Sequence, residues 1–325
     1  MKDKVLALLK KQDTYLSVEE MSHELGVTRA AIWKVIKKLQ GEGYIIDSST
    51  KKGYKLVEKP NAITPEELKP MLENNSLGQE IHYFKEIDST NEKAKALARE
   101  GCAEGTLVIA DRQYQGKGRM GRSWTSPEGT GIWMSLILKP EILPQYASQL
   151  TLVAGLCMCE AIIEVTGLEA WIKWPNDIVV NGKKVCGILT EMSAEIERIN
   201  YIILGIGVNV NQKEFPEDLP FATSLALEGG EDYIRISLIR AFLKRFEKEY
   251  EQYKAITSLV AIRNRYEKHC ITLGKTVKIT SGNEVFIAKA RTVAEDGNLI
   301  VETETGEEKF VYSGEVSVRG LYGYI

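Results

Sequence analysis

Residues 113–124 read QYQGKGRMGRSW, a segment in which glycines alternate with cations. The glycines are Gly116, Gly118 and Gly121, and the cations are Lys117, Arg119 and Arg122. Glycine lets a backbone approach a ligand closely, and Lys and Arg between glycines can gather around a phosphate or carboxylate. Apolar runs at 107–110 and 132–138 flank the segment, which predicts a loop strung between two core strands. A solvated surface hairpin is the alternative, and the loop alone does not decide between them.

The composition bounds the class of protein. With 325 residues, 44% apolar and 27% charged, the chain has material for two or three globular domains. Its five cysteines lack metal-binding spacing and it has three histidines, so we predict no metal site and no histidine-based triad. The cysteines lie mostly in apolar sequence, as in a reducing compartment. No segment approaches the roughly 20 uninterrupted apolar residues of a membrane span, so we expect a cytoplasmic protein without a membrane partner.

Charge is unevenly distributed along the chain. Residues 1–59 contain 12 Lys and Arg against 8 Asp and Glu, a balance of +4, whereas the whole chain carries −3. The other residues therefore carry −7. A basic first region on an acidic remainder predicts that the first region meets a polyanion.

The first 60 residues predict a winged helix-turn-helix. A helix at 2–11 is followed by a capping-box helix beginning at Ser17 and by a third helix capped by Thr28. A short hairpin over 44–56 follows. The third helix would enter the major groove and the hairpin would touch phosphates. The residues expected to bind DNA are Arg29, Trp33, Lys34 and Lys37 on the helix, and Lys51 and Lys52 on the wing. A helical protein-interaction domain is the alternative.

Residues 61–80 predict a linker, and a strand at 81–87 then leads into Asp88-Ser89-Thr90-Asn91. An alanine-rich amphipathic helix follows, from about residue 92 to 99. By itself the tetrapeptide favours a polar helix cap. Its other role would be to offer hydroxyl and amide groups to a polar ligand at the end of a strand.

The remaining segments predict a mixed sheet with helices and then a small barrel. Helices are expected at 150–165 and 236–253, and strands at 170–180, 184–191 and 201–210, with Asn181-Gly182 as a hairpin turn. Lys184 beside this turn would by itself be solvated. GIGVNV at 205–210 lacks the following helix of a dinucleotide-binding fingerprint. Residues 271–325 alternate in short strands with glycine turns, as in a small β-barrel.

Five motifs together resemble a known family. They are D-S-T-N at 88–91, G-K-G-R-M-G-R-S-W at 116–124, K-W-P-N-D at 173–177, K-V-C-G-I-L at 184–189 and G-I-G-V-N-V at 205–210. Each is weak alone, but in this order they resemble the biotin–protein ligases. With a winged helix ahead and a barrel behind, the whole chain is similar to the bifunctional bacterial members that also repress the biotin operon.

The resemblance implies an α+β protein with a winged helix-turn-helix at 1–60, a linker at 61–80, a catalytic ligase domain at 81–270 and an SH3-like β-barrel at 271–325. It implies that biotin and ATP, with Mg²⁺ on the nucleotide, form biotinyl-5′-adenylate, which then acylates a lysine of a biotin carboxyl carrier protein domain. Cations must offset the repulsion between a carboxylate and a triphosphate. The resemblance also implies an adenylate-dependent repressor that binds operator DNA as a homodimer.

The resemblance also assigns residues to each ligand. Those assigned to biotin are Ser89, Thr90, Asn91, Gln113, Lys117, Gly118, Arg119 and Lys184. Those assigned to the adenylate are Arg122, Trp124, Asn176, Asp177 and Asn209. Lys184, Arg119 and Asp177 are expected to be catalytic, Asp177 either as the base for the incoming lysine or as an orienting group. The best-known relatives have Arg where this chain has Lys117, and some stack a Trp on adenine where no Trp follows Asn211 here.

Two other functions stay open from the sequence. One is a transcription factor whose second domain senses a metabolite without chemistry, which pyrophosphate release would contradict. The other is lipoate ligation or octanoyl transfer, because those enzymes share this type of fold. A substrate panel of biotin against lipoate distinguishes this second alternative from biotin ligation.

Overall fold

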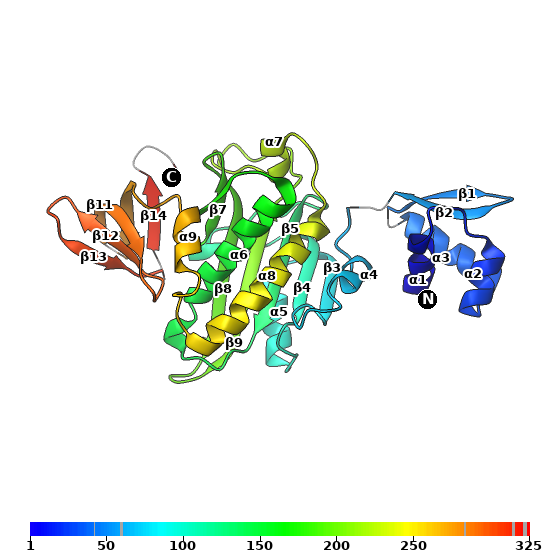
Figure 1. The fold of residues 1–325 in the computed structure, drawn as a ribbon, viewed down its shortest axis with the longest axis horizontal. Helices are drawn as coiled ribbons and strands as arrows, with labels where there is room; N and C mark the ends of the chain where they lie inside the picture. The colour runs from blue at the N-terminus through cyan, green and yellow to red at the C-terminus, as the bar shows by residue number, and fades with distance from the viewer. Residues whose placement is uncertain (42, 59–60, 283, 314–315, 321–323) are drawn as a thin grey trace. The chain divides into compact units, whose positions relative to one another are not determined.

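The computed structural model describes residues 1–41, 43–58, 61–282, 284–313, 316–320 and 324–325 (Figure 1). The chain divides into two compact units, Met1–Ala62 and Ile63–Ile325. Each unit has its own hydrophobic core. The finer boundaries at 60, 80 and 270 stay predictions.

The first unit is a helix-turn-helix followed by a β-hairpin. Its elements are α1 (Lys2–Lys11), α2 (Val18–Leu25), α3 (Arg29–Gly41), β1 (Ile45–Ser49) and β2 (Gly53–Glu58). The capping box at α2 is present, because Ser17 Oγ accepts from the Glu20 N–H and Glu20 accepts from the Ser17 N–H. α3 buries one apolar stripe, consisting of Ile32, Ile36 and Leu39. The antiparallel β1–β2 hairpin is the predicted wing.

The second unit is built on a seven-stranded mixed sheet in the order β3-β4-β5-β9-β8-β7-β6. These strands are β3 (Ile81–Ile87), β4 (Leu107–Gln113), β5 (Gly131–Leu138), β6 (Ala170–Lys173), β7 (Asp177–Val180), β8 (Lys183–Ala194) and β9 (Ile199–Asn209). Only the β3–β4 pair is parallel among the described strands. Asn181 and Gly182 both have positive φ and join β7 to β8, as the Asn-Gly signal predicted.

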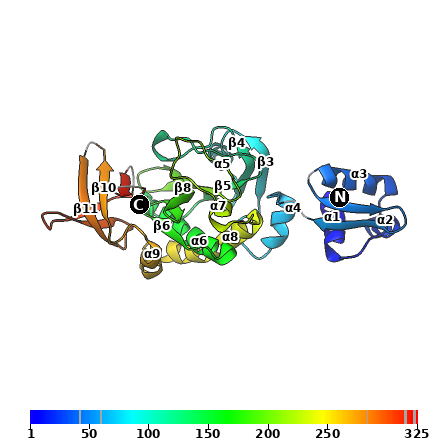
Figure 2. The ribbon, with the colours of Figure 1, turned by 90° about the horizontal axis from the view of Figure 1, so that it is seen from above.

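Helices cover both faces of this sheet (Figures 1 and 2). α6 (Gln149–Thr166) and α8 (Arg235–Ile256) pack on one face, and α5 (Thr90–Arg99) packs on the other through a separate cluster with β4, β5 and β9. The shorter helical elements are α4 (Pro65–Leu68), α7 (Leu225–Gly229) and α9 (Arg263–His269), with 3-10 turns η1 (Lys69–Met71), η2 (Arg119–Gly121) and η3 (Pro144–Tyr146). This arrangement leaves the start of α5 beside the loop that follows β4.

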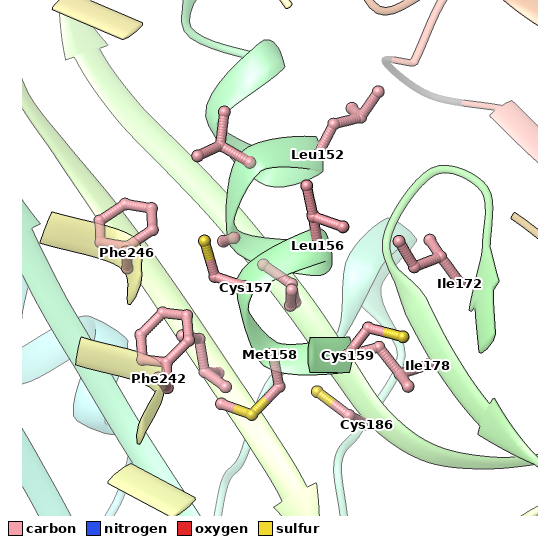
Figure 3. Packing of buried hydrophobic residues seen from close by; sticks show 14 of the residues in the cluster. Leu152, Leu156, Cys157, Met158, Cys159, Ile172, Ile178, Cys186, Phe242 and Phe246 are labelled. Atoms are coloured by element: carbon pink, nitrogen blue, oxygen red, sulfur yellow. The ribbon is translucent and has the colours of Figure 1, made fainter. Parts of the chain in front are cut away.

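α6 is the central core helix. Figure 3 shows its Cys157 and Met158 beside Phe242 and Phe246 of α8. Among the residues that the structure describes, one helical stretch, Pro144–Thr166, has the length and hydropathy of a membrane span. Of its most apolar window, 67% is buried inside the fold. A helix that is apolar all round and enclosed by other elements is a core helix, so its hydropathy is explained by burial.

The last part of the chain forms an antiparallel sheet of five strands in the order β13-β12-β11-β10-β14, where a small barrel was predicted. The strands are β10 (Thr276–Ser281), β11 (Glu284–Val293), β12 (Leu299–Thr303), β13 (Glu308–Val311) and β14 (Val316–Gly320). Its buried side chains belong to the same core cluster as α6 and the large sheet. This sheet therefore packs as part of the second unit and can contribute to a site there.

Candidate active site

A small cavity of about 50 Å³, the inner cavity, lies between the start of α5, the loop after β4, and strands β8 and β9. Every residue assigned to biotin from the sequence lines it: Ser89, Thr90, Asn91, Gln113, Lys117, Gly118, Arg119 and Lys184. The structure thus brings together residues up to 95 positions apart, counted from Ser89 to Lys184. Their roles toward biotin stay predictions.

Glycines form the floor of the inner cavity. Gly205 and Gly207 share one face of β9, and Gly187 of β8 is the cross-strand partner of Gly207. A Cβ on Gly207 would lie 2.6 Å from Trp124 Nε1, and one on Gly187 would lie 2.9 Å from the same indole. Only glycine at these two positions therefore leaves room for the Trp124 ring this close to the sheet. The sequence analysis missed this role, although the Gly-x-Gly spacing on a strand was visible.

A polar network fixes the end of the inner cavity nearest α5. The Thr90 N–H donates to Gln113 Oε1 at 2.8 Å, and Asn91 Nδ2 donates to Glu191 Oε2 at 2.8 Å. Ser135 Oγ lies 2.6 Å from Asn91 Oδ1. Sequence reasoning missed Glu191 and Ser135, because both come from strands whose facing became clear only in the sheet.

The preference for a helix cap at the tetrapeptide is wrong for Ser89. Ser89 occupies the N-cap position of α5, but its side chain accepts no capping hydrogen bond. It is 2% exposed and lines the inner cavity instead. A buried hydroxyl aimed at a cavity is available to a polar ligand, which was the alternative role.

A second cavity of about 550 Å³, the outer cavity, adjoins the inner one. The two share wall residues, which are Gly118, Arg119, Trp124, Asn176 and Lys184. The residues assigned to the adenylate all line the outer cavity: Arg122, Trp124, Asn176, Asp177 and Asn209. Its far wall comes from Phe215 and 218–222, and from β14 and Tyr324. A ligand occupying both cavities would pass Lys184 and Arg119.

Lys184 is not solvated, as its position beside a turn had suggested. Lys184 Nζ lies 2.6 Å from Asp177 Oδ1, and the two side chains are 24% and 12% exposed. The reason is the register of β7 and β8, which turns Lys184 toward the cavity wall rather than outward. The Nζ also lies 5.1 Å from the centre of the Trp124 ring.

Asp177 is held as a carboxylate. Burial alone would favour its neutral acid, but Lys184 and Lys173, with hydrogen bonds from Lys184 and Tyr324, keep the pKa of Asp177 below its ordinary value. Lys173 lies 3.9 Å over the Tyr324 ring, and burial lowers the pKa of Lys173 to about 8, against the attraction of Asp177. Neither Lys173 nor Tyr324 was singled out from the sequence, and Lys173 was visible in K-W-P-N-D.

Arg119 fastens the glycine-rich loop to two other parts of the unit. Its Nη1 donates to Asn176 Oδ1 at 2.7 Å, and its Nη2 donates to the backbone carbonyls of Ser313 and Val316 at 3.3 and 3.4 Å. The C-terminal sheet thus supplies acceptors to a residue expected to be catalytic. Arg122 lies on the wall of the outer cavity.

Comparisons with known proteins agree with this architecture. The model for the biotin/lipoate A/B protein ligase family matches residues 83–209, an HTH domain model matches 2–55, and the model of the biotin protein ligase C terminal domain matches 272–319. The bifunctional ligase/repressor BirA of Bacillus subtilis (strain 168) is 40% identical over 307 residues, covering 94% of each chain. This chain belongs to the BirA family of bifunctional ligase/repressors.

Other members of the BirA family agree with this membership. BirA of Escherichia coli (strain K12) is 30% identical over 97% of this chain and 96% of its own. Among solved structures, the biotin protein ligase from Aquifex aeolicus in complex with biotin and ATP aligns with a TM-score of 0.66 and 36% identity, over 74% of this chain and 99% of that one. The predicted family and α+β class are therefore confirmed, and this BirA-family chain has the predicted N-terminal helix-turn-helix.

The predicted DNA-binding residues lie on the surface of the first unit of this BirA-family chain. Arg29, Trp33, Lys34 and Lys37 are exposed on α3, and Lys51 and Lys52 are exposed in the β1–β2 turn. Trp33 is 52% exposed. Two of the cations have partners, since Arg29 Nη2 lies 2.7 Å from Glu19 and Lys52 lies 5.6 Å from the Tyr15 ring centre. A large exposed aromatic among cations suits a binding surface better than a solvated helix face.

Proposed function

We propose that this chain activates biotin with MgATP to biotinyl-5′-adenylate, transfers it to a lysine of a biotin carboxyl carrier protein domain, and binds operator DNA as an adenylate-dependent homodimer in the cytoplasm. One observation carries the ligase part: two cavities of different size meet at Lys184 and Arg119. A relative, the biotin protein ligase from Aquifex aeolicus solved in complex with biotin and ATP, supports it. The similarity to the bifunctional ligase/repressors BirA of Bacillus subtilis and Escherichia coli supports the repressor part.

In this proposal each cavity takes one share of the reaction. Thr90, Asn91 and Gln113 offer fixed polar groups to the ring end of biotin, and the carboxylate would reach the junction of the cavities. There Lys184 and Arg119 offset the charge that develops as the carboxylate oxygen attacks the α-phosphorus and pyrophosphate leaves. Mg²⁺ arrives on the nucleotide as part of the substrate. Trp124 stands between the cavities as an apolar wall for the adenylate.

Asp177 fits an orienting role better than that of a general base. Both of its oxygens have partners, Lys184 on one and Tyr324 on the other. A carboxylate whose pKa lies below its ordinary value is a weak proton acceptor at neutral pH. Asp177 would then fix the Lys184 ammonium toward the reacting oxygens. The carrier lysine would lose its proton to solvent or to the phosphate of the leaving AMP.

The test of the proposed function is mass spectrometry of a carrier domain after incubation with this protein, ATP and biotin. We expect an increment of biotin size, with pyrophosphate released in the absence of the carrier. A matched reaction with lipoate should give none. An unmodified carrier and no released pyrophosphate would instead indicate a transcription factor that senses a metabolite without chemistry. A lipoate-sized increment would indicate a lipoate ligase.

The Lys173 ammonium should make ATP binding depend on pH. Because the pKa of Lys173 is about 8, its charge is present below pH 8 and is lost as the pH rises through 8. Lys173 lines the outer cavity, where a triphosphate would bind. We expect the KM for ATP to rise about three- to tenfold between pH 7 and pH 9, as a cationic contact is lost. Steady-state kinetics of pyrophosphate release measure this.

Lys173→Met is the control for that pH profile. It should show the high KM already at pH 7, with a flatter profile. Lys173 also makes the folding stability depend on pH. In the unfolded chain this lysine titrates near pH 10.5, so the unfolded chain binds more protons between pH 8 and 10.5 and this group adds stability as the pH rises there. A profile that is unchanged in the variant would remove Lys173 from ATP binding.

The two wing lysines should contribute to DNA affinity and not to ligation. Lys51→Ala with Lys52→Ala should lower operator affinity about tenfold at 0.1 M salt and reduce the slope of log K against log salt by about two. Fluorescence anisotropy of a labelled operator across a salt series measures both. The matched control is Lys4→Ala with Lys11→Ala, two exposed lysines of α1 that are not among the residues expected to bind DNA. Loss of carrier biotinylation in the wing variant would contradict the separation of functions.

A further inference from the structure

Glu92 lies at the centre of an ion-pair chain that the reaction scheme above does not use. Its Oε1 lies 2.6 Å from Lys117 Nζ of the glycine-rich loop and 2.9 Å from Lys95 Nζ one turn along α5. Lys95 Nζ lies 2.7 Å from Glu191 Oε1, and Glu191 accepts the hydrogen bond from Asn91 described above. A continuous series of charged contacts thus runs from the loop to the polar end of the inner cavity.

We propose that Glu92 is a positioning residue whose contact with Lys117 latches the glycine-rich loop over the inner cavity and so retains the adenylate. The proposal rests on the proposed function, because the adenylate is the ligand to be retained. Glu92 touches neither the inner nor the outer cavity wall, so it acts through Lys117, which lines the inner cavity. The contact joins the glycine-rich loop to the first turn of α5.

The fixed side of the latch is well defined. Glu92 is in the first turn of α5, where the helix dipole favours a negative charge. Lys95 contacts the same Glu92 oxygen as Lys117 and is itself held by Glu191. Hydrogen bonds from Lys117 and then from Lys95 lower the pKa of Glu92 to about 2, so the group is charged at neutral pH. Lys117 therefore meets a carboxylate that is already placed and ionised.

On the loop side, Lys117 lies between two other attachments: the Gln115 N–H donates to the Asp88 carbonyl at 2.9 Å, and Arg119 has the hydrogen bonds described above. Within the loop, Gly118 N–H donates to the Arg122 carbonyl at 2.7 Å, which shapes the turn but does not tie it to the sheet. Two residues after Lys117, Arg119 ties the loop to Asn176 and to backbone carbonyls of the C-terminal part of the chain, so the contact of Lys117 with Glu92 is a further attachment between these two. Lys117 and Glu92 are both half-buried to exposed, at 48% and 37%, so the latch is of moderate strength and can open. A moderate latch suits a loop that must release its product.

The contact with Glu92 depends on the lysine at position 117, where the best-known relatives have Arg. A lysine is a point charge on a flexible stem and can meet a single carboxylate oxygen, as it does here with Glu92 Oε1. An adenylate in the cavities would meet the same ammonium from the other side. Glu92 would then share Lys117 with the ligand and keep the ammonium at the cavity rim. If Glu92 instead withdrew Lys117 from the ligand, removing Glu92 would slow release of the adenylate.

The test is the rate at which preformed biotinyl-adenylate leaves the protein, followed after rapid gel filtration. We expect Glu92→Gln to speed release about three- to tenfold, the range for a partly exposed charged contact. Labelling of free lysine by escaped adenylate should rise with it. The matched control is Glu100→Gln, an exposed glutamate at the other end of α5, which should release the adenylate at the wild-type rate.

A double-mutant cycle separates the latch from a general effect on the fold. Lys117→Met should speed release, and adding Glu92→Gln to it should change the rate less than twofold further, because the partner is already gone. Melting temperatures of the variants show whether folding is intact. Release by Glu92→Gln at or below the wild-type rate, or effects that multiply in the double variant, would overturn the latch. A wild-type protein that forms no adenylate would instead sink the proposed function.

Discussion

Replacing Lys184 with Met should slow formation of biotinyl-adenylate by about 100- to 1,000-fold, the usual cost of removing one placed electrostatic group. Lys184 stands where the two cavities meet, with its ammonium 2.6 Å from Asp177. Its loss removes the cation that would meet the biotin carboxylate and the α-phosphate together. Pyrophosphate release under saturating biotin and ATP measures the effect.

The same variant should also lose stability, which needs a control of its own. It leaves Asp177 buried without its nearest ammonium, at a cost of about 1 to 3 kcal/mol once the partial exposure of the pair is taken into account. Lys184→Met combined with Asp177→Asn removes the orphaned charge. We expect this double variant to regain most of the free energy of unfolding and none of the activity. Wild-type rates in the single variant would leave Lys184 only the structural role of pairing with Asp177.

Gly205→Ala should weaken biotin binding about 100-fold while the protein still folds. The new Cβ would lie 2.2 Å from Asn91 Oδ1, so Asn91 must move. That movement breaks its contacts with Ser135 and Glu191 and shifts the polar end of the inner cavity, and a displacement near 1 Å can cost this much. The overpacking itself should lower the free energy of unfolding by about 1 to 3 kcal/mol. Isothermal titration with biotin measures the affinity.

Gly155→Ala on α6 is the matched control, since it makes the same chemical change at another buried glycine. A Cβ there has no atom within 4 Å, and the position is helical. Alanine in a helix should add about 0.5 to 1 kcal/mol of stability, with biotin affinity unchanged. If Gly205→Ala binds biotin as the wild type does, the inner cavity is not the biotin site.

The features that could be predicted from the sequence are those encoded by residues close together in the chain. The loop at 116–122, the Asn-Gly turn and the capping box are read from neighbouring positions, and the structure has all three. Ser89 and Lys184 were misjudged by local rules. A serine before a helix is most often a cap, and a lysine beside a turn is most often solvated. Here Ser89, at the start of α5, lines the inner cavity, and the register of β7 and β8 turns Lys184 toward both cavities.

The supporting residues were out of reach because their partners are distant in the chain. Glu92 and Lys117 are 25 residues apart, and Asn91 and Glu191 are 100 apart. Tyr324 meets Asp177 across 147 residues. No period or short motif carries such pairs, so a single sequence shows the charged side chains without showing which one each will meet.

The contact between Arg119 and the C-terminal sheet has a consequence for the order in which the protein matures. Its acceptors on Ser313 and Val316 come 194 and 197 residues after it. A ribosome adding about 5 to 20 residues per second needs about 10 to 40 s to cross that interval. The DNA-binding unit, Met1–Ala62, has by then long left the exit tunnel. A nascent or prematurely terminated chain can therefore carry a folded operator-binding head while its loop still lacks the carbonyls that fasten it.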